Sequence, residues 1–119
     1  MSFETWDIGF AYVPNQEDGS VTTDRPVVII DNLGDKFTIC PLSKNFLQGE
    51  RIYKYTIRIE KDSEDALVMG LSYTSIIILD RHGDLPKFRI WGKPKKCPDS
   101  VIEKIEDLLE EMKRNGDYR

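Results

Sequence analysis

The chain has few of the residues from which metal centres and disulfide scaffolds are built. Its 119 residues include two cysteines, Cys40 and Cys97, and one histidine, His82. The cysteines form no Cys-x-x-Cys motif and have no metal-ligand spacing, so we expect ordinary reduced thiols. A single histidine argues against a zinc site and leaves one possible base for a Ser-His-Asp triad. We therefore expect neither a metal nor a cofactor.

Long apolar runs are also missing. No apolar segment approaches the roughly 20 residues that cross a bilayer, and residues 1–5 show no basic region followed by an apolar one. We expect a soluble, cytoplasmic protein with no membrane partner. A chain of 119 residues, of which 39% are hydrophobic, has the size of a single domain over residues 1–119 with one modest core.

The net charge of −4 hides an uneven distribution. Residues 1–24 carry five acidic and no basic side chains, and residues 99–112 carry six acidic side chains against one lysine. Residues 81–97, in contrast, carry six basic side chains against Asp84. Such a segment is typical of a phosphate-binding face. It is equally typical of a solvated, lysine-rich edge that discourages aggregation between strands.

The spacing of apolar residues predicts strands first and one helix last. The expected strands cover residues 7–13, 27–30, 36–42, 53–59, 75–79 and 88–91, with a further apolar segment at 67–71. Between them we expect a polar loop over residues 14–23, a hairpin turn over 31–35 and a loop over 44–50. The runs at 27–30 and 75–79 are continuous and predict strands buried on both faces, whereas 53–59 alternates and predicts a half-buried strand.

One helix is expected at the C-terminal end. Ser100 and Glu103 have the spacing of a capping box, and Gly116 is suited to end the helix. Apolar residues at helical spacing form one stripe, which consists of Val101, Ile102, Ile105, Leu108, Leu109 and Met112. Five to seven strands followed by one amphipathic helix predict a mainly β fold, a small antiparallel β-barrel closed or flanked by the helix.

The strongest functional signal lies around Arg25. A small polar loop ends at this arginine, and Pro26 follows it at the start of a run of β-branched residues. Proline pushes the residue before it into an extended conformation, so we expect Arg25 to be held at a strand entrance. A guanidinium fixed there suits recognition of a phosphate. The next strand ends at Ser43, and we expect Arg25 and Ser43 to converge on one concave surface.

These two residues also have plain structural interpretations. Arg25 would equally serve as a surface arginine paired with Asp24 or Asp18. Ser43 would equally serve as a strand-end hydroxyl that caps a turn. Its functional interpretation depends on Arg25 lying nearby in space.

Further candidates lie between residues 80 and 91. Asp80 either anchors a turn or orients a base, and His82 either is solvated in that turn or transfers protons. Lys87, Arg89 and Trp91 alternate onto one face of the expected last strand. Two cations and a stacking surface are the composition of a groove for single-stranded RNA, although Trp91 would equally fit beneath the helix.

With this layout, the chain resembles the MazF/PemK family of toxin endoribonucleases from type II toxin–antitoxin systems. The resemblance covers nearly the whole chain in the order of its elements. Its parts are Trp6-Asp7-Ile8, Asp18-Gly19-Ser20, Arg25-Pro26-Val27-Val28-Ile29-Ile30, Cys40-Pro41-Leu42-Ser43, Ser75-Ile76-Ile77-Ile78-Leu79-Asp80 and the C-terminal helix. The Arg-Pro strand and the Pro-Leu-Ser strand end are the specific ones.

The resemblance implies a small β-barrel of the MazF/PemK/CcdB type, a homodimer, and sequence-specific, metal-independent cleavage of single-stranded RNA. It also implies neutralisation by a cognate antitoxin protein. In that family the ribose 2′-hydroxyl attacks the neighbouring phosphate and leaves a cyclic phosphate and a 5′-hydroxyl. The matching catalytic positions are Arg25, for acid–base chemistry and charge stabilisation, and Ser43, for contact with the scissile phosphate. Asp80 and His82 are second-rank catalytic candidates, and the expected RNA-binding residues are Lys44, Lys87, Arg89 and Trp91.

One position departs from the family pattern. Many members carry Arg-Thr-Ile-Asp at the fifth strand, where this chain has Ile77-Ile78-Leu79-Asp80, so the arginine is missing. Arg81 or His82 would have to compensate from the adjacent turn. The missing arginine keeps two alternatives open: a catalytically silent barrel that binds a protein or nucleic acid, and a barrel that acts on a protein such as a gyrase, as a related toxin group does.

We predict that the protein is a homodimer. The resemblance implies it, and Trp6, Tyr12 and the two buried runs offer more apolar surface than one small barrel covers. Light scattering during size exclusion at micromolar concentration should give about twice the chain mass of 13.8 kDa. The mass of a single chain would contradict a groove built across two subunits.

Overall fold

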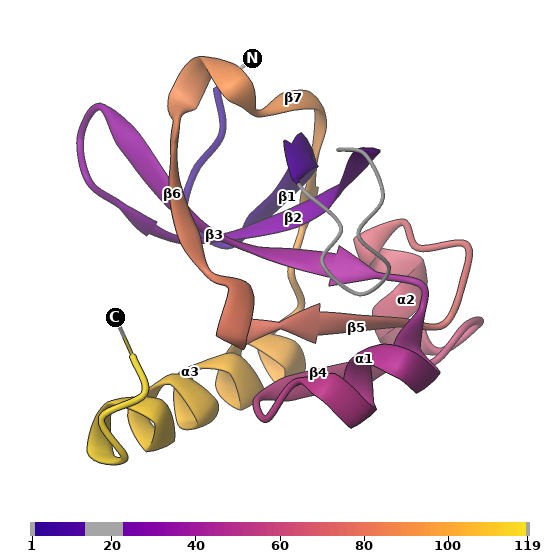
Figure 1. Cartoon of the computed structure of the whole chain (residues 1–119). Helices are drawn as coiled ribbons and strands as arrows, with labels where there is room; N and C mark the ends of the chain where they lie inside the picture. The colour runs from indigo at the N-terminus through magenta and orange to yellow at the C-terminus, as the bar shows by residue number, and fades with distance from the viewer. Residues whose placement is uncertain (1, 14–22, 119) are drawn as a thin grey trace.

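The computed structural model describes residues 2–13 and 23–118 (Figure 1). Its strands are β1 (Asp7–Val13), β2 (Thr23–Asn32), β3 (Lys36–Ser43), β4 (Thr56–Ile59), β5 (Ser75–Ile78), β6 (Gly83–Pro86) and β7 (Trp91–Lys96). Its helices are α1 (Phe46–Ile52), α2 (Glu64–Met69) and α3 (Asp99–Arg114), with 3-10 turns η1 (Leu79–Arg81) and η2 (Lys87–Arg89). The predicted loop at 14–23, except for its last residue, and the Asp18-Gly19-Ser20 motif lie outside the described residues.

The seven described strands form one antiparallel sheet in the order β4-β5-β3-β2-β1-β7, and β6 pairs with β3 outside this order. One edge of β3 changes partner along its length, because residues 36–39 pair with β6 and residues 42–43 pair with β5. Pro41, which has no backbone N–H, falls in the gap between these partners. Among the described strands, β4 and β7 stand at the two ends of the order and do not pair with each other, so the sheet is open. The mainly β class with a C-terminal helix is confirmed; the closed barrel is not.

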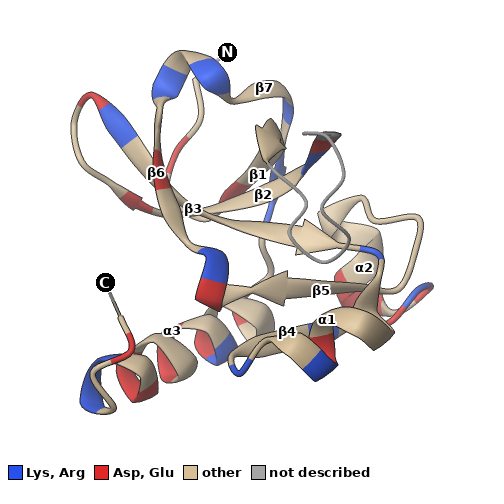
Figure 2. Cartoon of the chain, viewed as in Figure 1, with Lys and Arg blue, Asp and Glu red and all other residues tan. Residues whose placement is uncertain are grey.

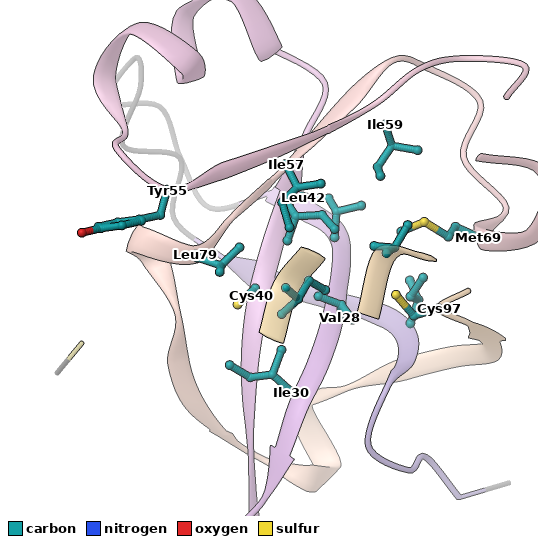
Figure 3. Close-up of a cluster of buried hydrophobic side chains, with 14 of the residues drawn as sticks. Val28, Ile30, Cys40, Leu42, Tyr55, Ile57, Ile59, Met69, Leu79 and Cys97 are labelled. Atoms are coloured by element: carbon teal, nitrogen blue, oxygen red, sulfur yellow. The ribbon is translucent and has the colours of Figure 1, made fainter. Parts of the chain in front are cut away.

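The central strands are buried on both faces, as their continuous apolar runs predict. Beyond Lys36, neither β3 nor β5 carries a charged side chain (Figure 2). Alternate side chains of β2 and β3 point into two clusters. Val28, Ile30, Cys40 and Leu42 join the larger cluster (Figure 3), and Val27, Ile29, Phe37 and Ile39 join the smaller one. A slip of one residue would exchange the two sets of side chains, so the packing fixes the register.

The helix α3 covers the larger cluster with the predicted apolar stripe. Val101, Ile105 and Met112 are buried, and Ile102, Leu108 and Leu109 pack against the cluster partly buried. Opposite them, Tyr55, Ile57 and Ile59 of the β4 region are buried, which confirms the predicted inner face of residues 53–59. Burial of each large apolar side chain contributes about 1.5–3 kcal/mol, so this contact between helix and sheet is a main source of stability.

The ends of α3 follow the prediction at one terminus only. Gly116 has a φ of 73°, and its N–H and that of Asp117 donate to carbonyl groups of the last helical turn, which is a Schellman motif. At the other end Pro98 is the N-cap, and no described side chain caps the helix. The expected capping box is wrong because the Ser100 hydroxyl donates to Asp65 of α2 instead, at 2.8 Å.

Two short helices occupy segments predicted as a loop and as an apolar run. The expected loop over 44–50 contains most of α1, and residues 67–69 belong to α2. The Ser63 hydroxyl accepts the Ala66 N–H at 3.1 Å, and α2 ends at Gly70 with a φ of 72°. These are ordinary helix caps. Leu67 is 70% exposed, so this segment presents part of its apolar surface to water.

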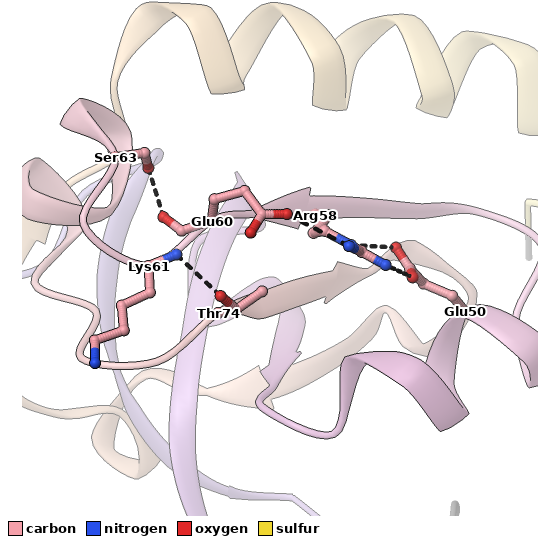
Figure 4. A network of polar contacts seen from close by, with 6 residues as sticks. All are labelled: Glu50, Arg58, Glu60, Lys61, Ser63 and Thr74. Carbon is pink, nitrogen blue, oxygen red and sulfur yellow. Dashed lines mark hydrogen bonds and ion pairs between the residues drawn. The ribbon is translucent and has the colours of Figure 1, made fainter.

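An ion-pair network joins α1 to β4 (Figure 4). Arg58 of β4 donates to both carboxylate oxygens of Glu50 on α1, and its other terminal nitrogen lies 3.4 Å from Glu60. Hydrogen bonding to Arg58 lowers the pKa of the Glu50 carboxyl below its ordinary value. Because these side chains are partly in water, the network positions α1 more than it stabilises the fold.

Close packing of α1 on β5 depends on Gly49. A Cβ atom at this position would overlap the Cδ1 atom of Ile76. Ile76 is fully buried, so its side chain has no free space into which it could move. The helix follows directly after Ser43 and residues 44–45, and this contact therefore sets the path of the chain as it leaves β3.

We predict that Gly49→Ala destabilises the protein by about 1–3 kcal/mol through overpacking, although alanine is the better helix former by about 1 kcal/mol. Urea unfolding measures the change. Ile76→Val removes the overlapping methyl group and costs about 0.5–1.5 kcal/mol alone. The double variant should lose less free energy of unfolding than the two single variants lose together. Strict additivity would show that this contact does not limit the approach of α1.

Candidate functional site

One cleft of about 660 Å³ collects residues from four parts of the chain. The start of β2 with the adjoining part of β1, the end of β3 and the segment that follows α2 all contribute to its walls. Figure 1 shows that β3 ends beside α2. Lining residues with polar or aromatic side chains include Phe10, Asp24, Arg25, Ser43, Lys44 and Tyr73.

Strand register brings Arg25 and Ser43 to this cleft. The β2–β3 ladder aligns Val27 with Pro41, and continuing it by two residues sets Arg25 opposite Ser43. Both residues line the cleft, so they lie on one concave surface, as predicted. Their catalytic roles stay a prediction.

Arg25 is held in the cleft with an unused donor. Its side chain is partly buried, and its Nε atom is buried with no hydrogen-bond partner among the described residues. An unsatisfied buried donor costs about 1–3 kcal/mol, a cost that a bound acceptor would remove. The alternative pairing with Asp24 does not occur in the described structure, where Asp24 accepts the indole N–H of Trp91 at 3.1 Å. A phosphate oxygen is an acceptor that suits a guanidinium.

Ser43 combines a structural bond with a spare donor. Its hydroxyl oxygen accepts the backbone N–H of Asn45 at 3.1 Å, which is the turn-capping role left open by the sequence. The side chain is buried at the cleft wall. Because a hydroxyl that accepts one bond still carries its own proton, Ser43 can donate to a ligand in the cleft.

One lysine lines this cleft and the aliphatic chain of a second reaches its rim. The Lys44 ammonium lies 4.9 Å from the centroid of the Tyr73 ring, and both residues line the cleft. From β7, the aliphatic chain of Lys95 reaches the rim at Gly70, where an added Cβ would lie 3.3 Å from Lys95 Cε. The basic segment 81–97 thus contributes one side chain to this rim. Sequence reasoning missed Lys95 and Tyr73, because neither belongs to a motif.

Asp80 and His82 line a different, smaller cavity of about 280 Å³. The Asp80 carboxylate accepts the backbone N–H groups of Lys54 at 3.0 Å and Tyr55 at 2.7 Å. The His82 ring stacks on Tyr118 with 4.3 Å between ring centroids. Of the two interpretations of Asp80, the structure favours the anchor, and it does not bring either residue to the cleft of Arg25.

The predicted strand over residues 88–91 is wrong. Residues 87–89 form the turn η2, in which the Ile90 N–H donates to the Lys87 carbonyl, and β7 begins only at Trp91. The expected alternation of Lys87, Arg89 and Trp91 on one strand face therefore does not apply. The Lys87 ammonium lies over the Phe37 ring at 4.8 Å. Trp91 is 48% exposed, which excludes the alternative that the helix covers it.

The position of the missing arginine lies in the core. Ile77 is fully buried in the larger cluster and pairs with Leu42. A charged side chain there would be costly without a partner. Arg81 lines the smaller cavity and donates to the Tyr53 hydroxyl at 3.5 Å. The second basic side chain among the described lining residues of the Arg25 cleft is therefore Lys44, and not Arg81 from the adjacent turn.

The two cysteines are buried free thiols. Burial raises the pKa of Cys40 to about 12, and burial together with Asp65 raises that of Cys97 to about 12. Among the described residues no group of three or more His, Cys, Asp or Glu side chains could hold a metal ion. In the same residues we find no helix with the length and apolar character needed to span a membrane.

Comparison of the sequence with known protein families gave no matching family model, and no curated protein matches it significantly. Neither comparison assigns an activity, a substrate or a partner to the chain. The resemblance to the MazF/PemK family therefore rests on the sequence motifs alone and stays a prediction.

We predict that Asp80→Ala destabilises the fold by about 1–3 kcal/mol, because two backbone N–H groups lose their acceptor and each such hydrogen bond contributes about 0.5–1.5 kcal/mol. Asp80→Asn keeps one acceptor oxygen, so its stability should lie between that of the wild type and that of Asp80→Ala. Asp107→Ala, at an exposed site on α3, is the matched control and should change stability little. Chemical unfolding measures all three. Unchanged stability of Asp80→Ala would contradict the anchoring role.

Proposed function

We propose that this chain is a metal-independent endoribonuclease that cleaves single-stranded RNA, the toxin of a toxin–antitoxin pair with a MazF/PemK-like barrel. The observation that carries the proposal is Arg25, whose buried Nε has no hydrogen-bond partner among the described residues and which lines a cleft together with Ser43. An antiparallel sheet with α3 packed on its core is compatible with this fold family.

The cleft offers donors to the atoms on which charge develops. When the 2′-hydroxyl attacks the phosphorus, the 5′-oxygen leaves and negative charge grows on the phosphate oxygens. The Arg25 guanidinium stabilises that charge with oriented donors, and the Ser43 hydroxyl adds another. Lys44 lies beside them at the cleft and binds the RNA backbone.

Proton transfer requires an acceptor as well as a donor. Arginine stays protonated in proteins, so Arg25 stabilises the leaving 5′-oxygen by a hydrogen bond and does not accept a proton. The leaving oxygen takes its proton from water. Asp24 supplies a carboxylate to the same cleft, and its bond to Trp91 uses only Oδ1. In this proposal Asp24 takes the proton of the 2′-hydroxyl, a role that the sequence motifs did not suggest.

A second candidate function is a binding module without catalysis. Two observations favour it: Ile77 is buried where family members carry arginine, and His82 lines another cavity. The cationic cleft would then hold a nucleic acid or an acidic protein segment without cutting it.

We predict that the wild-type protein cuts single-stranded RNA in the presence of a chelator and leaves cyclic phosphate ends. Arg25→Ala should lower the rate by orders of magnitude with little change in melting temperature, because a partly exposed arginine that has no ion pair with the described residues contributes little to folding. Ser43→Ala should cost about 1–3 kcal/mol of transition-state stabilisation, or roughly 5- to 150-fold in rate.

Arg51→Ala, on the exposed surface of α1, is the matched control and should keep full activity. Full activity of Arg25→Ala would eliminate the proposed mechanism. Binding of RNA without cutting, across a varied RNA pool, would instead support the silent module.

A further inference from the structure

An aromatic pair stands at the edge of the cleft. Phe10 of β1 and Trp91 of β7 are cross-strand partners, with ring centroids 5.2 Å apart and an interplanar angle of 29°. The indole N–H donates to Asp24 at 3.1 Å, which fixes the orientation of the ring. Next to it, Gly92 has a φ of 97°, and an added Cβ would approach Phe10 Cδ2 to 3.0 Å. Strand pairing, hydrogen bonding and a glycine thus all hold this pair in place.

This pair leaves much of its apolar surface in water. Phe10 is 39% exposed and Trp91 is 48% exposed, so neither ring is needed to fill the core. Phe10 also lines the cleft and pairs with Pro26, the residue next to Arg25. A rigid, half-exposed aromatic surface therefore borders the same cleft as Arg25.

The surroundings of the pair indicate what it binds. Among the described lining residues of the cleft, Arg25 and Lys44 are basic and Asp24 is the one carboxylate. The aliphatic chain of Lys95 also reaches Gly70 at the rim. Their ligand should carry negative charge next to a flat apolar ring. An unpaired nucleotide has both, and stacking of one base on an aromatic side chain contributes about 1–3 kcal/mol. Bases within a duplex are covered by their neighbours and would not fit.

We propose that Phe10 and Trp91 form a stacking site for one unpaired nucleobase of an RNA strand whose phosphate binds at Arg25. This inference rests on the proposed function, because it requires RNA in the cleft. Stacking on this pair would favour single strands over duplexes, and Phe10 and Trp91 would be the two residues that contact the base.

The test is a binding measurement that needs no cleavage. Fluorescence anisotropy is followed with an end-labelled 2′-O-methyl oligonucleotide, in which the attacking hydroxyl is blocked. Trp91→Ala should weaken binding roughly 5- to 150-fold, whereas Trp91→Phe should retain most of the affinity. Phe88→Ala, at a site that is 82% exposed and outside the cleft, is the control and should bind as wild type does.

A scan with abasic nucleotides locates the base without changing the protein. One abasic position should weaken binding to the wild type and cause little further loss in Trp91→Ala, because both changes remove the same contact. Equal losses in both proteins at every position would overturn the proposal. This comparison is made between oligonucleotides on the same protein, so it also holds if Trp91→Ala is less stable.

Two further outcomes separate this inference from the proposed function. Weak binding by Arg25→Ala together with unchanged binding by Trp91→Ala and Phe10→Ala would overturn the stacking site and leave the nuclease proposal standing. No binding of any single-stranded oligonucleotide by the wild type would overturn both. Light scattering provides the remaining check, since loss of a dimer on Trp91→Ala would assign the pair to a contact between copies of this chain.

Discussion

The ladder between β2 and β3 is the constraint on which the rest of the structure depends. Both strands are buried on both faces, and their side chains fill two different clusters, so a slip of one residue would place each set of side chains in the cluster shaped for the other. Arg25 lies near the start of β2 and Ser43 ends β3. The register that protects the core therefore also sets the two candidate site residues opposite each other, at the end where the ladder meets solvent.

The two cavities differ in how their polar groups are used. In the smaller one, the Asp80 carboxylate is bonded to the backbone, and the ring of His82 is stacked on Tyr118. In the larger cleft, the Nε of Arg25 has no partner among the described residues, and Ser43 retains a proton to donate. The polar groups of the smaller cavity are therefore used within the fold. The larger cleft offers unused donors together with the basic side chain of Lys44, which suits an anionic ligand.

Apolar spacing predicted much of this fold because burial controls it. The bounds of β1, the buried face of residues 53–59 and the stripe of α3 all follow from side chains that must leave water. The short helix α2 was missed because residues 67–71 were read as an apolar run, without regard to its caps Ser63 and Gly70. Likewise, the turn at residues 87–89 depends on local backbone bonds that alternation does not reveal.

The motif around Arg25 located one wall of the cleft, but not its other walls. Phe10 and Trp91 are far apart in the sequence and meet only through the pairing of β1 with β7. Lys95 reaches Gly70 because β7 passes beside α2, a neighbourhood that no local pattern encodes.

A crystal structure with an uncleavable single-stranded oligonucleotide tests the central claim most directly. We expect a phosphate oxygen within hydrogen-bond distance of Arg25 Nε and of the Ser43 hydroxyl; an oligonucleotide bound elsewhere, with the cleft empty, would contradict it.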